Sequence, residues 1–221
     1  MDNPMSSVQA LATTGRFITL EGVDGAGKTT HLAWLVEYLK SRHVPLCVTR
    51  EPGGTPLGEA LRELLLHEAM SIETEALLMF ASRQQHLQSC IIPALNAGQW
   101  VVCDRFTDAS YAYQGGGRGL PVEKLAMLEH WVHSDIQPDL TLLFDVPAEV
   151  SFERVRGARS PDRFEQLDLA FFQRVRQAYL DRAVADPLRF RIINANRAID
   201  EIQLELAEVI MSYIQGEAHA S

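Results

Sequence analysis

Apolar residues in this chain gather in five short runs that show little alternation with polar positions. A strand buried on both faces produces such a run, whereas a strand with one face in water alternates. The runs are therefore predicted to be the strands of a parallel sheet. They occupy residues 17–20, 45–49, 100–104, 140–145 and 190–193.

Between these runs, apolar residues recur at the three- and four-residue spacing of a helix. Strands that alternate with helices predict an α/β fold of three layers, in which helices cover both faces of the five-stranded parallel sheet. The glycine run 115–117 predicts a mobile break. The expected helices occupy residues 32–42, 57–67, 73–96, 125–132, 169–179 and 199–213, with one more beginning after Pro147.

Length and charge narrow the classes of protein that this chain can represent. Its 221 residues suit a single domain, which we expect at 16–221 after a flexible N-terminal tail at 1–15. The net charge of −9 repels phosphate backbones and anionic lipid, so we expect neither nucleic acid nor membrane as a partner. The three cysteines lack metal-type spacing and no secretion signal is evident, which favours the cytoplasm.

A glycine-rich turn separates the first predicted strand from the first predicted helix. Residues 22–29 fit the phosphate-binding pattern G-x-x-x-x-G-K-[ST]. Its backbone N–H groups would face phosphate oxygens, while Lys28 would reach the β- and γ-phosphates and Thr29 would bind Mg²⁺. The predicted nucleotide-binding residues here are Gly22, Val23, Asp24, Gly25, Ala26, Gly27, Lys28 and Thr29.

The end of the third predicted strand separates the classes that share such a loop. A GTPase needs Asn-Lys-x-Asp, which the sequence lacks, and many ATPases end this strand in Asp-Glu. Here the strand ends in Asp104-Arg105. A fixed cation does not activate water but would hold an acceptor phosphate, which favours transfer between two nucleotides over hydrolysis. Asp104 is then a candidate Mg²⁺ partner.

Arginines are concentrated in a segment that follows the fourth predicted strand. Because Gly157 and Pro161 interrupt it, the segment is a poor continuous helix. We expect a lid at about 154–165 that closes over the phosphates, excludes water and brings arginine to the transferring group. Its arginines are Arg154, Arg156, Arg159 and Arg163.

At this point the chain resembles the bacterial thymidylate kinases, over nearly all of residues 16–214. The resemblance implies the P-loop nucleoside monophosphate kinase fold and the phosphorylation of dTMP to dTDP by ATP and Mg²⁺, a step toward dTTP. Glycine at position 25 and the arginine-rich lid place it with the members whose catalytic arginine lies in the lid. The matching segments are 21–30, 49–55, 104–106, 113–119 and 162–165.

The resemblance implies roles for the residues near the phosphates. Asp24 would approach the 3′-hydroxyl of dTMP and help to organise Mg²⁺, while Arg50 and Arg105 would hold the dTMP phosphate. Arg156 would reach the ATP phosphates, and Arg154 would contact adenine. The resemblance also adds Thr30 to the ATP site. The implied catalytic residues are Lys28, Arg105, Arg156 and Asp24, and the implied metal residues are Thr29, Asp24 and Asp104.

The resemblance also implies how the sugar and base are held. Phe80 would stack on thymine and Arg83 would bond a base carbonyl, although many relatives place the aromatic four residues before the arginine, where this chain has Met79. Tyr113 would crowd a ribose 2′-hydroxyl. The implied dTMP-binding residues are Asp24, Arg50, Glu51, Pro52, Phe80, Arg83, Arg105, Ser110, Tyr113 and Gln114.

Two alternatives to this reading stay open at the level of sequence. One is a kinase for another nucleoside monophosphate, which would keep the loop and lid but change the base pocket. The other is a nucleotide-binding switch or scaffold without turnover, although such a protein has no need of a second anion site. The resemblance further implies a homodimer.

Overall fold

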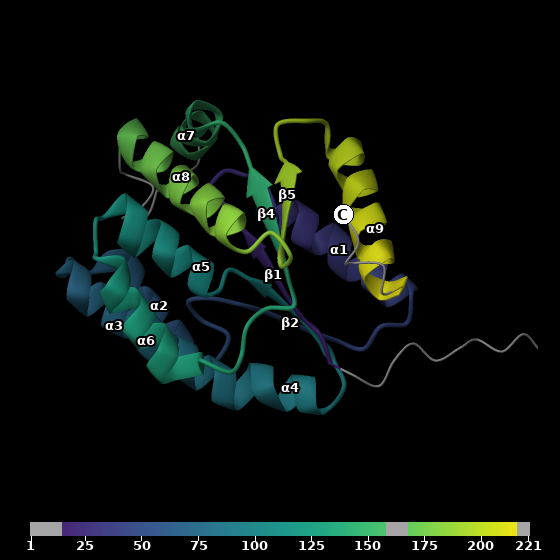
Figure 1. The fold of residues 1–221 in the computed structure, drawn as a ribbon, viewed down its shortest axis with the longest axis horizontal. Helices are drawn as coiled ribbons and strands as arrows, with labels where there is room; N and C mark the ends of the chain where they lie inside the picture. The colour runs from purple at the N-terminus through teal and green to yellow at the C-terminus, as the bar shows by residue number, and fades with distance from the viewer. Residues whose placement is uncertain (1–14, 158–167, 216–221) are drawn as a thin grey trace, which may run out of the picture.

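A parallel sheet of five strands lies at the centre of the computed structural model, which describes residues 15–157 and 168–215 (Figure 1). The strands run in the order β2-β3-β1-β4-β5, and every neighbouring pair is parallel. All five predicted strands are confirmed to within one residue at each end. Their bounds are β1 (Phe17–Glu21), β2 (Leu46–Arg50), β3 (Trp100–Asp104), β4 (Leu140–Asp145) and β5 (Phe190–Asn194).

Helices cover both faces of this sheet, as the alternating pattern predicts. Figure 1 shows α1 and α9 on one side and α4, α5 and α8 on the other. The helices are α1 (Lys28–Ser41), α2 (Pro56–His67), α3 (Ile72–His86), α4 (Ile92–Asn96), α5 (Thr107–Ser110), α6 (Val122–His133), α7 (Ala148–Arg156), α8 (Leu169–Ala185) and α9 (Ile199–Gln215), and two π-helical segments are η1 (Leu87–Ile91) and η2 (Tyr111–Gly117).

The burial of the strands follows their position in the sheet. The side chains of β1 are all buried, as are most of those of β3 and β4, which explains their unbroken apolar runs. The edge strands β2 and β5 are only partly covered, and Val48 and Ile192 are exposed. The expectation of burial on both faces therefore holds for the inner strands and not for the edges.

Two helical predictions need correction in detail. The helix expected at 73–96 is divided into α3, η1 and α4, and the π-helical segment comes just before Pro93, which has no N–H to donate. The mobile break expected at 115–117 is instead the end of η2, packed against α8. A Cβ added to Gly117 would lie 2.5 Å from the Phe171 ring. Close packing thus explains this glycine better than flexibility does.

The strand register brings polar residues to one edge of the sheet. Arg50 of β2 is level with Asp104 of β3, and Asp104 is level with Leu20 of β1. From β1 the chain runs through α1 to β2 on one side of the sheet, whereas β4 and β5 lie on the other side of β1. Ligands bind outside the carboxyl ends of parallel strands at such a point, which directs attention to the loops after β1, β2 and β3.

Several other features of the chain bear on the sequence predictions. Within the part that the structure describes, no helix is long and apolar enough to cross a membrane. The cysteines are free: Cys103 is buried, while Cys47 and Cys90 are partly exposed with their sulfur atoms 3.6 Å apart. The tail predicted at 1–15 and the lid predicted at 154–165 lie for the most part outside the described residues.

Candidate active site

The loops after β1, β2 and β3 enclose a cleft of about 860 Å³. Its walls carry the cations Lys28, Arg50, Arg62 and Arg105 and the carboxylates Asp24, Glu51, Glu59 and Asp104. Because cations and carboxylates are equal in number, the cleft is not uniformly positive, and an anion would bind beside its cations. The cleft is large enough for a nucleotide, since typical ligand pockets measure about 300–1,000 Å³.

The glycine-rich loop lies between β1 and α1, as the sequence predicts. Gly22 has φ +137°, and a Cβ there would lie 2.4 Å from the Phe144 carbonyl oxygen, so only glycine fits. Lys28 folds back over the loop and donates from Nζ to the carbonyl oxygens of Gly22 (2.8 Å) and Val23 (3.0 Å). Burial, with the nearby Arg105 charge, lowers the pKa of Lys28 to about 8 against the pull of its carboxylate neighbours.

Helix α7 packs against the same loop and explains why position 25 carries no side chain. Gly25 has φ +78°, and a Cβ there would lie 2.8 Å from the Ser151 carbonyl oxygen. The Ser151 hydroxyl donates to the Asp24 carbonyl, and Arg154 donates from Nη1 to the Gly25 carbonyl at 3.0 Å. An arginine at position 25 would therefore clash with α7, so an arginine that serves the phosphates cannot come from this position.

Three predicted metal residues border the cleft: Asp24, Thr29 and Asp104. Asp104 Oδ1 is buried and has no hydrogen-bond partner among the described residues, which suits an oxygen donor for Mg²⁺ or for its bound water. Both Asp24 oxygens already accept hydrogen bonds from protein side chains. The described residues contain no cluster of three or more His, Cys, Asp or Glu side chains placed to hold a metal ion. The donor set therefore fits Mg²⁺ that is also held by phosphate oxygens.

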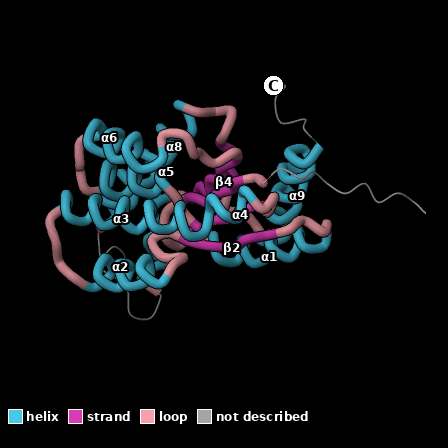
Figure 2. Tube along the Cα trace, turned by 90° about the horizontal axis from the view of Figure 1, so that it is seen from below, coloured by secondary structure: helices cyan, strands magenta, loops and turns pink. Residues whose placement is uncertain are grey.

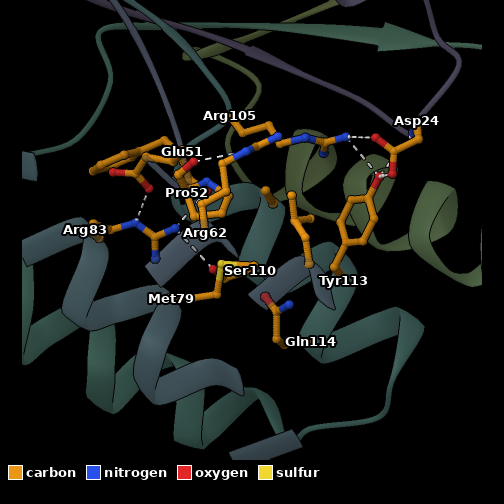
Figure 3. A pocket seen from close by; sticks show the side chains of 13 residues that line it. Asp24, Glu51, Pro52, Arg62, Met79, Arg83, Arg105, Ser110, Tyr113 and Gln114 are labelled. Carbon is orange, nitrogen blue, oxygen red and sulfur yellow. Dashed lines mark hydrogen bonds and ion pairs between the residues drawn. The ribbon is translucent and has the colours of Figure 1, made fainter. Parts of the chain in front are cut away.

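Arg105 lies at the centre of the site and has an unusual backbone conformation. Its φ is +71°, in the left-handed region that costs a non-glycine residue roughly 1–3 kcal/mol. Its guanidinium donates to Asp24 Oδ1 at 2.5 Å and to the Tyr113 hydroxyl at 3.0 Å (Figure 3). It also donates to the Tyr179 hydroxyl at 3.0 Å. Burial alone would raise the pKa of Asp24, but Arg105 and Lys28 outweigh it and hold that pKa below its ordinary value.

Glu21 fixes the turn that carries Arg105. Its buried carboxyl group accepts from the Phe106 backbone N–H at 2.6 Å and from the Tyr179 hydroxyl at 2.8 Å. Burial and the negative charge of Asp108 raise the pKa of Glu21 to about 8, although Arg105 opposes them. The carboxyl group thus holds both the backbone after Arg105 and one of the hydroxyls that Arg105 contacts.

A second, inner pocket adjoins the cleft on the side of α3 and η2 (Figure 3). Ser110, Tyr113 and Gln114 all line it, as their predicted common helical face requires. Tyr113 joins the two spaces, because its hydroxyl donates to Asp24 Oδ2 at 2.7 Å. The inner pocket is lined by Asp24, Glu51, Pro52, Arg62, Leu66, Met79, Arg83, Arg105, Phe106, Ala109, Ser110, Tyr113 and Gln114.

Arg83 is buried in the wall of this pocket and tightly held. Its Nε donates to Glu51 Oε2 at 2.8 Å, and its Nη2 donates to the Ser110 hydroxyl and the Phe106 carbonyl, each at 3.1 Å. His86 occupies the other Glu51 oxygen at 3.0 Å. Arg83 Nη1 is buried and has no hydrogen-bond partner among the described residues, so two N–H donors remain available. Glu51 therefore acts first as the anchor of Arg83.

The structure does not bring Phe80 to the inner pocket. Its ring is 2% exposed and packs with Ala76 and Tyr111 in a separate apolar cluster, while Met79 lines the pocket. Helix geometry gives the reason: Met79 lies four residues before Arg83, on the face of α3 that is turned toward the pocket. The structure thus places Met79, and not Phe80, in the wall of the pocket, contrary to the position expected for Phe80.

The remaining predicted residues differ in how close they lie to the cleft. Arg50 lines it and forms a bidentate pair with Glu59 (3.3 and 2.8 Å), and Thr29 and Thr30 line it as well. Arg156 is exposed, lies 3.9 Å from Glu153, and lines neither space. Arg159 and Arg163 fall outside the described residues.

Four residues of the site escaped sequence reasoning: Glu21, Arg62, Glu75 and Tyr179. Tyr179 belongs to an ordinary apolar stripe, and Arg62 and Glu75 lie in helices with ordinary charge patterns. Glu21, at the end of an apolar run, offers the one usable signal, because a carboxyl group directly after a buried strand needs a partner. The other three gain their partners only through the folded structure.

This geometry defines a class of protein. A glycine loop with its lysine meets an adjoining pocket lined by arginines, and the two share a cation, Arg105, at the carboxyl edge of a parallel sheet. That is the arrangement of a P-loop nucleoside monophosphate kinase, in which donor and acceptor phosphates meet.

Comparison with known proteins defines the family within this class. The family described as Thymidylate kinase matches residues 20–206. Thymidylate kinase from Cupriavidus metallidurans is 60% identical over 196 residues, which cover 89% of this chain and 98% of that protein. Thymidylate kinase from Methylobacillus flagellatus is 58% identical over 199 residues, which cover 90% of this chain and 98% of that protein. The crystal structure of thymidylate kinase from Ehrlichia chaffeensis matches with a TM-score of 0.75 and 34% identity, and the match covers 90% of this chain and 99% of that one. The chain belongs to the thymidylate kinase family, and its activity is the phosphorylation of dTMP.

The raised pKa of Glu21 predicts a specific dependence of stability on pH. Because this pKa is about 8 in the folded chain and 4.5 without the fold, the folded state keeps a proton that the unfolded state loses between these values. The contribution of Glu21 to the free energy of unfolding is therefore fully present below pH 4.5. It declines by up to about 1.4 kcal/mol per pH unit until pH 8. Glu21→Gln cannot titrate, so the difference in unfolding free energy between wild type and variant should decline over this range.

Urea denaturation at pH 5, 6, 7 and 8 measures this difference. Glu73→Gln is the matched control, because Glu73 is exposed on α3 and its variant should track the wild type. Wild-type and Glu21→Gln curves that stay parallel across the whole range would show that Glu21 is already ionised at pH 5.

Proposed function

We propose that the chain transfers the γ-phosphoryl group of ATP to dTMP with the help of Mg²⁺, and that the residues around the two spaces divide this work. The observation that carries the proposal is the polar edge of the inner pocket. Arg83 Nη1 offers unpaired donors and Gln114 Oε1 an unpaired acceptor, among the described residues. Thymine presents the complementary edge, a carbonyl O4 beside N3–H. Cytosine presents an amino group beside a bare N3, so it would leave like groups facing one another.

The phosphates of the two substrates would meet at Arg105. The dTMP phosphate would lie against Arg105 and Arg50, while the ATP phosphates would lie in the glycine loop against Lys28. The acceptor oxygen is already an anion, so no general base is required, and Lys28 and Arg105 supply charge that offsets the transferring group. Since Arg105 is held by Asp24 and two tyrosine hydroxyls before substrate binds, it would need little rearrangement.

Asp24 and Tyr113 would complete the sugar site. The Tyr113 hydroxyl is bound to Asp24 beside the inner pocket, where a ribose 2′-hydroxyl would be crowded. Glu51 and Pro52 form another part of the wall. Mg²⁺, held by Thr29, Asp104 and phosphate oxygens with Asp24 nearby, would supply charge neutralisation between the phosphates.

The adenine and lid contacts rest on the position of α7. Arg154 is bonded to the Gly25 carbonyl, which places its side chain at the rim of the glycine loop. Arg156 lies two residues further along, and its role requires a lid that moves it toward the phosphates. We also assign the enzyme to the cytoplasm, where its three free cysteines would stay reduced.

A coupled assay of ADP release tests the function. With ATP and Mg²⁺, we expect fast release with dTMP, slower release with dUMP, and little with dCMP, dGMP or no acceptor. Omission of Mg²⁺ should abolish release. Preference for another monophosphate would overturn the base assignments to Arg83, Ser110 and Gln114, and release without an acceptor would identify an ATPase instead.

Removal of the lid arginine should affect turnover far more than binding. Arg156→Ala should lower kcat by about 10³-fold, as for arginines that touch a transferring phosphoryl group, while KM for dTMP stays within about threefold. Arg42→Ala is the control, because Arg42 follows the C-terminal end of α1, away from the glycine loop, and contacts Tyr38. An Arg156→Ala enzyme with normal kcat would remove Arg156 from the mechanism.

We further propose that two copies pair through α3 and α6. Leu77, Met127 and Trp131 are 54, 64 and 81% exposed on these helices, which lie side by side with α2 at one end of the molecule (Figure 2). Large apolar side chains that are exposed on neighbouring helices commonly mark an interface. Sedimentation velocity should show a dimer for the wild type and a monomer for Trp131→Glu. Val184→Glu, at a 79% exposed site on α8, should stay dimeric. A dimeric Trp131→Glu protein would exclude this face.

A further inference from the structure

The amide of Gln114 cannot by itself choose between thymine and cytosine. A glutamine side chain carries an acceptor oxygen and a donor nitrogen, and half a turn about its last bond exchanges them. With the oxygen toward the base it would accept from N3–H of thymine, and with the nitrogen toward the base it would donate to N3 of cytosine. Selectivity therefore depends on whatever fixes the orientation of this amide.

Glu75 is the group that fixes it. Glu75 lies in the first turn of α3, is completely buried, and accepts from Gln114 Nε2 through Oε1 at 2.8 Å. Its Oε2 forms an ion pair with Arg118 Nη1. A carboxylate held by a guanidinium has acceptor atoms and no donor, so it can bond the nitrogen of the amide and not the oxygen.

The consequence is visible at the other end of the amide. Gln114 Oε1 is buried and has no hydrogen-bond partner among the described residues, although an acceptor left in this way costs about 1–3 kcal/mol. Reversal of the amide would place Oε1 against the Glu75 carboxylate, where two acceptors repel. The orientation is therefore determined by a residue that does not line the pocket.

Helix α3 carries Glu75 on the same face as two residues that line the base pocket. Glu75, Met79 and Arg83 follow one another at intervals of four residues, so they share one face of the helix. Met79 and Arg83 line the pocket, while Glu75 contacts it through Gln114. One helical face thus supplies an apolar surface, a donor for the base, and the anchor of the acceptor.

We propose that Glu75 is a positioning residue for base selectivity, which it exerts by holding the Gln114 amide with its oxygen toward the base. The proposal rests on the proposed reading of thymine by Arg83 and Gln114. It assigns the rejection of a cytosine ring to an ion-paired carboxylate outside the pocket.

Glu75→Gln tests the proposal, because a glutamine of the same shape can turn its own amide and so allow Gln114 to turn. The substrates are dTMP and 5-methyl-dCMP, which share the methyl group and differ at the base edge in question. We expect the ratio of kcat/KM for dTMP to that for 5-methyl-dCMP to fall by about tenfold or more relative to wild type. Glu73→Gln, an exposed change two residues away, should leave the ratio unchanged.

Further outcomes separate positioning from a merely structural role. If Glu75 only stabilises the fold, Glu75→Gln will slow both substrates together and keep the ratio, which would overturn the proposal. Glu75→Asp keeps an acceptor-only carboxylate and should keep the selectivity. Should Glu75→Gln not fold, Glu75→Met also leaves the amide free to turn and should lower the ratio, and an unchanged ratio there would likewise overturn the proposal. A wild-type enzyme that uses both substrates equally would instead overturn the underlying reading of thymine.

Discussion

The hydrogen bonds of Arg105 with Asp24, Tyr113 and Tyr179 join every part of the site to every other. A guanidinium that is largely removed from water is costly unless its donors are satisfied, so these partners stabilise the position of Arg105. Asp24 belongs to the glycine loop, Tyr113 to the pocket wall and Tyr179 to α8. A single cation therefore sets the spacing between the two spaces, and a shift in any one of the three elements would be transmitted to the other two.

The backbone around Arg105 is held with equal firmness. Its positive φ would relax in an isolated turn, but Glu21 bonds the next N–H and Arg105 itself donates its own N–H to the Leu20 carbonyl at 3.0 Å. Both anchors come from the end of the central strand. The strain is thus maintained by the most deeply buried element of the sheet, and the side chain is directed into the cleft before any substrate arrives.

Much of the fold and part of the site could be predicted from the sequence, because each of these features follows from a local pattern of residues. The five strands, their parallel arrangement, the glycine loop and the Asp104-Arg105 ending each follow from a short segment. Met79 and Phe80 show the limit of prediction from sequence. Both fit a helix that contains Arg83, and only the packing of α3 decides which of the two faces the pocket. The prediction of a mobile break at 115–117 is wrong for a similar reason, because no local pattern indicates that α8 packs against these glycines. The partner of Tyr179 lies 158 positions away, beyond the reach of periodicity.

The residues that would touch substrate can be recognised from local sequence patterns, whereas the residues that would make the pocket selective cannot. Arg83 and Gln114 stand in recognisable positions, but each is ambiguous alone: a guanidinium can turn, and an amide can present either end. Glu51 with His86 fixes the first, and Glu75 with Arg118 fixes the second, across sequence separations of 32 and 39 residues. In both cases a carboxylate fixes the orientation of the side chain that would contact the base. Since a pocket rejects a wrong base only when its own polar atoms cannot adapt, these anchors matter for selectivity as much as the atoms that face the base.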